Sequence, residues 1–224
     1  MALSVRQKVW FDPMKKILLI GDSIRAGYDK YVKMSLKDVA EVGYPGENCR
    51  FTTYILRNLK AWVDQAFPTG GVDLVHFNVG LWDDLRMEDG EVLVSIEEYE
   101  RNLDRIFGLI KRYCPDAKIV FATSTPVREE LFRELKRYNR DTEAYNSVGA
   151  RLAEKHGAAV NDLYALMKAQ PVEFHSDMTH YYTKDGTRVI TNQVLSCLEE
   201  QLGIKGEPLD FDALFDEKKD IVGI

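Results

Sequence analysis

The sequence predicts an α/β protein in which helices cover both faces of a mainly parallel, five-stranded sheet, giving three layers. Short apolar segments bounded by turn residues alternate with longer segments in which apolar residues recur at helical spacing. Such an alternation is typical of parallel strands joined by crossover helices. The chain has 224 residues, of which 45% are hydrophobic, enough for one substantial core. We expect a single domain over 1–224, with its core at 16–202 and a tail at 203–224.

The first half of the chain contains three apolar runs that are short enough to be strands. The first run stops at Gly21, and a segment with proline and glycine, 68–71, precedes the third. Ile55, Leu59 and Val63 recur on one face of the helix between them. In chain order we expect a strand at 17–20, a short helix or lid-like connection at 28–36, a strand at 38–42, a helix at 52–67, a strand at 72–77 and a helix at 96–113.

The second half continues the alternation. Pro115 ends the preceding helix, and Gly157 is the expected C-cap of a later one. The charged segment 127–140 could form an insertion helix. After Gly203, acidic and apolar residues are interleaved, which predicts a surface-packed or partly mobile tail. The remaining elements are a strand at 117–122, a helix at 142–156, a short strand at 158–160, a helical turn at 163–167 and a last helix at 183–202.

The charge of the chain limits its partners. Acidic residues outnumber basic ones, 36 to 30, and the formal net charge is −6. No basic run or stripe is present, which argues against nucleic acid as a partner, and an anionic membrane surface would repel the chain. We therefore expect a small-molecule substrate. The sequence predicts no oligomeric state.

Several features indicate a cytoplasmic protein. Residues 1–16 contain no apolar h-region and no small-residue cleavage site, and the run at 17–20 is far too short to span a bilayer. The three cysteines, Cys49, Cys114 and Cys197, are odd in number and widely spaced, as is typical of reduced thiols.

A metal site is one interpretation of the cluster His175, Asp177 and His180. No second cluster in the sequence completes a set of ligands. We therefore expect neither a metal nor an organic cofactor.

The segment Gly21-Asp22-Ser23 predicts an exposed nucleophile. A buried strand that stops at a glycine lifts the next side chains out of the carboxyl edge of a parallel sheet. The following helix directs its N-terminus at that point, which favours developing negative charge. Alternatively, Asp22 and Ser23 only cap the helix.

Asp177 and His180 stand three residues apart in a polar, turn-prone stretch before the last helix. On such a turn the carboxylate can accept the proton of histidine Nδ1, which leaves Nε2 free as a base for a serine. A capped helix start, or a surface histidine with an incidental neighbour, is the alternative interpretation.

All the candidate groups fall on one edge of the predicted sheet. Ser23 follows the first strand, Gly46 the second, and Asn78 ends the third, while Asp177 and His180 lie beyond the fifth. Sites in open parallel sheets lie beyond the carboxyl ends of the strands. This common edge therefore predicts an active site.

Four short blocks follow one another along the chain. They are Gly21-Asp22-Ser23, Pro45-Gly46-Glu47-Asn48, Asn78-Val79-Gly80-Leu81-Trp82-Asp83 and Asp177-x-x-His180. In this order they resemble the blocks of the SGNH (GDSL-type) hydrolase family. The resemblance extends over residues 16–202 and implies a flavodoxin-like fold and an esterase or acylhydrolase activity that needs no cofactor. It also implies that the N–H groups of Ser23 and Gly46 form an oxyanion hole.

The third block departs from the family pattern. When Gly80 is aligned with the family's glycine, Trp82 occupies the position of the family's asparagine. The third oxyanion donor is then either the amide of Asn78 or the indole N–H of Trp82. Alternatively, Trp82 packs or stacks on a sugar, and Asn78 fixes a loop.

We expect a serine esterase that cleaves short acyl esters, above all acetyl esters carried by carbohydrates, with the triad Ser23, His180 and Asp177. The alternatives are a thioesterase or lysophospholipase of the same fold, and a binding module with a degenerate oxyanion hole. Asp22 could equally cap a helix, and Glu47 and Asn48 could build a turn. The expected substrate contacts are Asp22, Glu47, Asn48 and Tyr181, with Arg25 on a solvated helix face.

Overall fold

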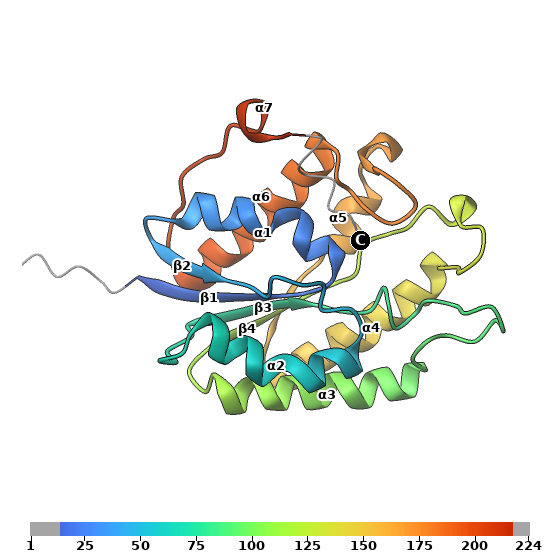
Figure 1. The fold of residues 1–224 in the computed structure, drawn as a ribbon, viewed down its shortest axis with the longest axis horizontal. Coiled ribbons are helices and arrows are strands. Elements are labelled where there is room, and N and C mark those ends of the chain that lie inside the picture. Colours follow the sequence, from blue (N-terminus) through green and yellow to red (C-terminus); the bar gives the residue numbers. More distant parts are fainter. Residues whose placement is uncertain (1–13, 217–224) are drawn as a thin grey trace, which may run out of the picture.

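A five-stranded sheet forms the centre of the molecule in the computed structural model, which describes residues 14–216 (Figure 1). All neighbouring strands are parallel, and their order across the sheet is β2-β1-β3-β4-β5. This confirms the predicted α/β class. The strands are β1 (Lys15–Ile20), β2 (Ala40–Gly43), β3 (Leu74–Asn78), β4 (Lys118–Ala122) and β5 (Ala159–Asn161).

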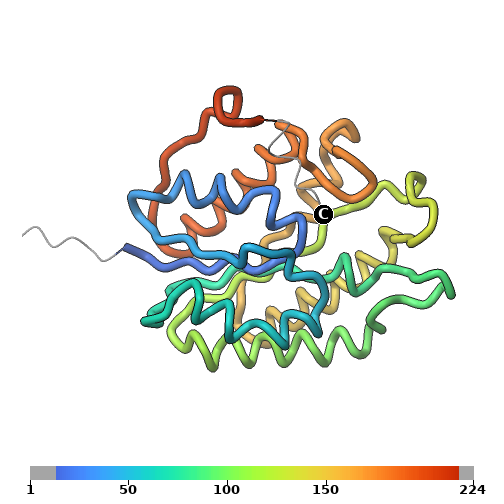
Figure 2. Tube along the Cα trace, viewed as in Figure 1, coloured from blue at the N-terminus to red at the C-terminus, as the bar shows by residue number. Residues whose placement is uncertain are grey.

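Helices cover both faces of the sheet and complete the three layers (Figures 1 and 2). One face carries α1 (Ser23–Leu36), α5 (Leu163–Lys168) and α6 (Lys184–Leu202). The other carries α2 (Thr52–Ala66), α3 (Ile96–Tyr113) and α4 (Asn139–His156). Shorter helical segments are η1 (Glu129–Leu131), η2 (Val172–Phe174) and α7 (Phe211–Leu214).

The inner strand β1 shows why the run 17–20 is continuously apolar. Ile17 and Leu19 pack on the side of α1 and α6, whereas Leu18 and Ile20 pack on the side of α2 and α3. Successive side chains of a strand point to opposite faces, so every position of a strand covered on both sides faces a core, which favours apolar residues. Burial of each such side chain contributes about 1.5–3 kcal/mol to folding.

Helix α1 starts earlier than the predicted range 28–36. It begins at Ser23 because Asp22 caps it, its side chain accepting from the backbone N–H of Ile24. The start of this helix is packed against the rest of the protein, since its buried side chains include those of Ile24, Arg25 and Tyr28, and the capping Asp22 is buried as well. The lid-like connection that the sequence allowed is therefore wrong.

The charged segment 127–140 does not form an insertion helix; only η1 lies within it before α4 begins at Asn139. The Asn139 side chain accepts from the N–H of Val127 at 2.8 Å and donates to its carbonyl at 2.9 Å. Lys136 pairs with Arg86 in an isolated antiparallel bridge. These contacts satisfy the backbone without a helical ladder and hold the segment against the loop after β3.

The described part of the tail, 203–216, packs onto α1. Phe211 lies against Tyr31, with ring centroids 4.9 Å apart, and Ser35 exchanges hydrogen bonds with Glu207. The rest of the predicted tail, 217–224, and most of the stretch searched for a targeting signal, 1–13, lie outside the described residues. Within 14–216, no helix combines the length and apolarity needed to cross a membrane.

Candidate active site

Ser23 stands where the chain leaves the carboxyl edge of the sheet. β1 ends at Ile20, and Ser23 is the first residue of α1. The Asp22 side chain accepts a 2.9 Å hydrogen bond from the N–H of Ile24, which fixes the turn. Ser23 therefore lies at the N-terminus of α1, where the free backbone N–H groups and the helix dipole favour negative charge.

Ser23, His180 and Asp177 form a chain of hydrogen bonds. Ser23 Oγ lies 2.8 Å from His180 Nε2, although 157 residues separate them in the sequence. His180 Nδ1 lies 2.7 Å from Asp177 Oδ2. Because a carboxylate only accepts, Nδ1 carries the proton and Nε2 accepts from the serine hydroxyl. This geometry divides the roles as a nucleophile, a base and an orienting carboxylate require.

Asp177 is tied into the turn that presents His180. Its Oδ1 accepts from the N–H groups of Thr179, at 2.6 Å, and His180, at 2.7 Å. Burial alone would raise the pKa of Asp177, but the hydrogen bonds from the His180 ring and from these two backbone groups lower it to about 2. Asp177 is thus ionised at neutral pH and can stabilise a positively charged His180.

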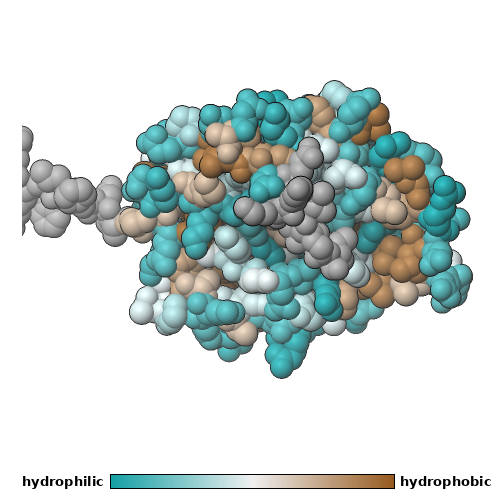
Figure 3. All heavy atoms as spheres, turned by 45° about the horizontal axis from the view of Figure 1, so that its top comes forward, coloured by the Kyte–Doolittle hydropathy of each residue, from teal (hydrophilic) through white to brown (hydrophobic). Residues whose placement is uncertain are grey.

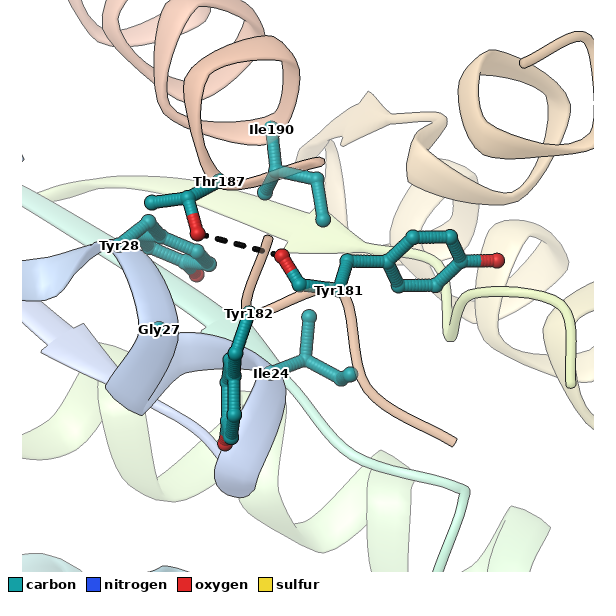
Figure 4. Close-up of a pocket in the computed structure, with 7 residues that line it drawn as sticks. All are labelled: Ile24, Gly27, Tyr28, Tyr181, Tyr182, Thr187 and Ile190. Carbon is teal, nitrogen blue, oxygen red and sulfur yellow. Dashed lines mark hydrogen bonds between the residues drawn. The ribbon is translucent and has the colours of Figure 1, made fainter. Parts of the chain in front are cut away.

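Tyr182 contacts both His180 and Ser23. Its ring is stacked on that of His180, with centroids 4.7 Å apart and an interplanar angle of 17°. Its hydroxyl donates a 2.6 Å hydrogen bond to the Ser23 carbonyl. Tyr182 stands beside Gly27 of α1 (Figure 4), where an added Cβ would lie 2.8 Å from the tyrosine ring. Gly27 therefore leaves room for the ring that orients His180.

The loop after β2 carries Gly46 and is held by Arg25. The side chain of Arg25 donates to the carbonyls of Pro45, at 3.0 Å, and Glu47, at 2.5 Å, and forms an ion pair with Asp29. Arg25 is only 2% exposed, so the prediction of a solvated helix face is wrong. The residues around Arg25 in the sequence do not indicate that its side chain binds a loop twenty residues further along the chain.

Glu47 and Asn48 lie at the site, but internal contacts occupy their side chains. The Glu47 carboxylate accepts from the hydroxyl of Tyr54, at 2.6 Å, and from the indole N–H of Trp62, at 3.1 Å. Asn48 Oδ1 accepts from the N–H of Arg50 at 2.8 Å. These contacts fit the alternative that both residues build the turn. Because both also line the open space beside Ser23, their contact with substrate stays a prediction.

Two further predicted substrate contacts are buried and line neither of the open spaces beside Ser23. Asp22 is fully buried, and its Oδ1 accepts from the side chain of Asn78 as well as from Ile24. Burial raises the pKa of Asp22, and these hydrogen bonds oppose the rise. Tyr181 is also buried, and its hydroxyl donates to the carbonyl of Pro126 at 3.0 Å. The structure thus gives both residues internal roles.

Asn78 and Trp82, the two candidates for a third oxyanion donor, have different surroundings in the structure. Asn78 is buried and donates to Asp22 at 2.8 Å, and Gly21 lies so close that a Cβ there would meet Asn78 Oδ1 at 2.0 Å. Trp82 lines the open space around Ser23. Its indole N–H has no hydrogen-bond partner within residues 14–216. Position therefore favours Trp82 over Asn78.

Two grooves meet at Ser23. The wide groove has a volume of about 830 Å³ and includes Tyr44, Gly46, Phe51, Met87 and Leu93. The narrow groove has a volume of about 420 Å³ and includes Leu81, Phe132, Arg137, Met178 and His180. Ser23, Trp82, Leu85 and Leu135 line both.

The end of the molecule with the loops after β3 and β4 carries hydrophobic side chains amid a mostly hydrophilic surface (right of Figure 3). Met87, Leu93 and Leu135, which line the wide groove, are exposed members of these loops. Apolar surface of this kind is typical of a ligand-binding groove.

Arg137 is a site residue that sequence analysis missed. It is only 9% exposed and lines the narrow groove with Ser23 and His180. Its Nε donates to the carbonyl of Leu81, and the Asp84 carboxylate lies 3.7 Å away. An arginine in a charged segment is ordinarily solvated, so its burial depends on how the loop folds back and could not be read from the sequence.

No group of three or more His, Cys, Asp or Glu side chains in the described part of the chain could hold a metal ion. His175, the third member of the cluster in the sequence, packs against Tyr181, with ring centroids 4.0 Å apart and the rings tilted by 35°.

Comparison with solved structures shows the same fold in several proteins. The acetyl xylan esterase AlAXEase superposes with a TM-score of 0.68 at 17% identity, over 82% of this chain and 99% of that one. The lipase/acylhydrolase from Enterococcus faecalis gives 0.67 at 20% identity, over 88% and 100%. Axe2, an acetylxylan esterase from Geobacillus stearothermophilus, gives 0.62 at 16% identity, over 88% and 97%.

No curated protein matches the sequence. The model of the GDSL-like lipase/acylhydrolase family matches residues 19–183, which include Ser23, Asp177 and His180. This match covers most of the chain and agrees with the resemblance found in its four sequence blocks. The protein therefore belongs to the GDSL-like lipase/acylhydrolase family.

Proposed function

We propose that the protein is a serine esterase that works through an acyl-enzyme. The observation that carries the proposal is the continuous chain of hydrogen bonds from Ser23 Oγ through His180 to Asp177. His180 Nε2 takes the hydroxyl proton while Oγ attacks the ester carbonyl. Asp177 stabilises the resulting imidazolium. His180 then returns the proton to the departing alcohol, and later activates the water that releases the acid.

The negative charge of the tetrahedral intermediate needs hydrogen-bond donors. We assign the backbone N–H groups of Ser23 and Gly46 and the indole N–H of Trp82 to this role. The arginine-held loop around Gly46 and the location of Trp82 beside Ser23 support the assignment. Asn78 is not included because its amide is engaged by buried Asp22. Loss of one such donor typically lowers kcat by about 10²–10³.

The acyl group of the substrate is short, above all acetyl, and the alcohol is a carbohydrate. Two of the structural neighbours are described as acetyl xylan esterases. The half-buried ring of Trp82, at the junction of both grooves, is suited to stacking on a sugar ring. Free thiols at Cys49, Cys114 and Cys197 support a cytoplasmic location.

A thioesterase or lysophospholipase is the second candidate. The apolar wide groove favours it, since a volume of about 830 Å³ exceeds the needs of an acetyl group. A series of p-nitrophenyl esters from two to twelve carbons separates the two candidates. A maximum of kcat/KM at two to four carbons supports the short-acyl substrate, and preference for eight or more contradicts it.

Hydrolysis of p-nitrophenyl acetate by the wild type and by Ser23→Ala tests the proposed activity. We expect turnover by the wild type and none above background by the variant, with unchanged circular dichroism and melting temperature. An inert wild type would favour the remaining alternative, a binding module of this fold. Full activity in Ser23→Ala would remove Ser23 from the role of nucleophile.

A further inference from the structure

Arg137 is a buried cation with unused hydrogen-bond donors. Its Nε donates to the Leu81 carbonyl, but neither terminal nitrogen has a hydrogen-bond partner in the described part of the chain. Both terminal nitrogens are at least partly accessible to solvent. The space that Arg137 lines is the narrow groove beside Ser23 and His180.

The carboxylates of Asp84, Asp22 and Asp177 act on the charge of Arg137, but none of them accepts a hydrogen bond from its guanidinium group. The Asp84 carboxylate lies 3.7 Å from Arg137 Nε, too far for a direct hydrogen bond, and Asp84 accepts instead from Thr142 at 2.6 Å. Burial raises the pKa of Asp84 to about 7, so this carboxylate is only partly ionised at neutral pH. A buried guanidinium whose terminal nitrogens have no acceptor is costly unless a ligand supplies one.

Two aromatic rings flank the guanidinium group of Arg137. Its central carbon lies 5.9 Å from the centroid of the Trp82 ring and 5.8 Å from that of Phe132. Such contacts hold the planar group in one place, which reduces the entropy lost when a ligand binds. Its terminal nitrogens then present the forked donor pair that fits a carboxylate or a phosphate.

The narrow groove lies on the side of Ser23 where the alcohol must leave. His180 has to protonate the departing oxygen, so the alcohol portion of the ester lies next to its ring. His180 and Asp177 line the narrow groove, whereas the wide groove includes Gly46 and neither of these two residues. A group bound by Arg137 therefore belongs to the alcohol portion.

We propose that Arg137 is a specificity-determining residue that binds an anionic group, a carboxylate or a phosphate, on the alcohol portion of the substrate. The proposal rests on the esterase function proposed above and narrows its substrate class. The net charge of −6 means that the protein as a whole repels anions. An anionic substrate group therefore needs a positive charge within the groove itself. Arg137 supplies such a local positive site.

Butyrate esters of three 3-substituted phenols test this proposal. The substituent is a methoxycarbonyl, a carboxylate or a phosphate group, so acyl group and ring are constant and the two anions are distinguished. The measured quantity is kcat/KM of each charged ester relative to the neutral one. We expect Arg137→Gln to lower this ratio by about tenfold or more for at least one anion, mainly through KM, and Arg137→Lys to lower it less.

Arg133→Gln is the matched control, since Arg133 lines the same groove but is exposed. It removes the same charge from the rim and should leave the ratio unchanged. An unchanged ratio in Arg137→Gln overturns the proposal. An equal fall in Arg133→Gln, or a loss of kcat shared by neutral and charged esters, also overturns it. Hydrolysis of the neutral ester by the wild type, and its loss in Ser23→Ala, tests the esterase function separately.

A measurement on the wild type covers the case in which Arg137 variants do not fold. 3-Hydroxybenzoate and its methyl ester are the products released from two of these substrates. We expect the carboxylate to inhibit hydrolysis competitively at a concentration about tenfold lower than the methyl ester does. Equal inhibition by the two compounds contradicts binding of a carboxylate at Arg137, and 3-hydroxyphenyl phosphate tests the phosphate in the same way.

Discussion

The hydroxyl of Tyr182 donates a 2.6 Å hydrogen bond to the carbonyl of Ser23, while the tyrosine ring is stacked on His180. One side chain thus contacts both partners of the proposed proton transfer. These two contacts fix the backbone at Ser23 and the plane of the imidazole relative to each other, and Tyr182 also lines the wide groove. The triad geometry therefore depends on a residue that takes no part in the chemistry.

The two contacts of Tyr182 predict different results for two substitutions. Tyr182→Phe keeps the ring and removes the hydroxyl, and we expect it to lower stability by about 1 kcal/mol with the pH profile of kcat retained. Tyr182→Leu also removes the stacked ring, and we expect kcat to fall by a factor on the order of 10² with a shifted pH profile. Urea denaturation and pH–rate profiles measure both. Identical profiles for the wild type and Tyr182→Leu would show that the ring does not orient His180.

Trp82→Phe tests the third oxyanion donor. The substitution keeps an aromatic ring between the grooves but removes the indole N–H, so we expect kcat to fall by about 10²–10³ with little change in KM. Asn78→Ala is the comparison: loss of the bond to Asp22 should lower the melting temperature more than Trp82→Phe does. A kcat that is insensitive to Trp82→Phe would leave the oxyanion to other donors.

Arg25 acts as a clamp on the loop around Gly46, since it donates to the carbonyls on both sides of that glycine. We therefore expect Arg25→Lys to impair catalysis although the charge is conserved. A lysine can still pair with Asp29 but cannot hold the Pro45 and Glu47 carbonyls at the same time. We expect kcat to fall by about tenfold or more because the Gly46 N–H is displaced from its place. Steady-state kinetics at 25 °C, with the melting temperature as a check on folding, measures this. Wild-type kcat in this variant would mean that the loop keeps its shape without the clamp.

Asp83 predicts a pH-dependent loss of stability. Burial raises its pKa to about 7, above the value of 3.8 for an unperturbed aspartate, despite hydrogen bonds from Thr52. The folded protein therefore binds more protons at this group than the unfolded chain between about pH 4 and 7, and its stability falls as pH rises through that range. In Asp83→Asn this contribution is absent. Urea denaturation between pH 4 and 8 should show the wild type losing stability relative to the variant, and parallel curves would contradict the assignment.

The sequence predicted the fold well because the inner strands β1, β3 and β4 are buried on both faces over most of their length. The apolar run at 17–20 and the Gly21-Asp22-Ser23 turn are local signals, and their reading does not depend on distant residues. The same holds for Asp177 and His180, three residues apart on one turn. Their approach to Ser23 followed from parallel topology, which brings the carboxyl ends of strands to one edge.

The missed features all depend on tertiary contacts. Arg25 and Arg137 are charged residues that fold inward to satisfy carbonyls of distant loops, and neither periodicity nor composition signals this. Residues 127–140 are rich in helix-forming side chains, yet the hydrogen bonds between Val127 and Asn139 close most of them into a loop in which only η1 is helical before α4 begins. Asn78 looked available at a strand end, but its amide is engaged by the buried Asp22, which lies 56 residues earlier in the sequence.

Labelling with a fluorophosphonate probe, followed by mass spectrometry of the peptides, tests the central claim most directly. An activated serine forms a covalent adduct with this probe, and an ordinary serine does not. We predict one adduct in the wild type, on the peptide that contains Ser23, and none in Ser23→Ala or His180→Ala. A wild type that stays unlabelled, or an adduct on another residue, would contradict the proposed nucleophile.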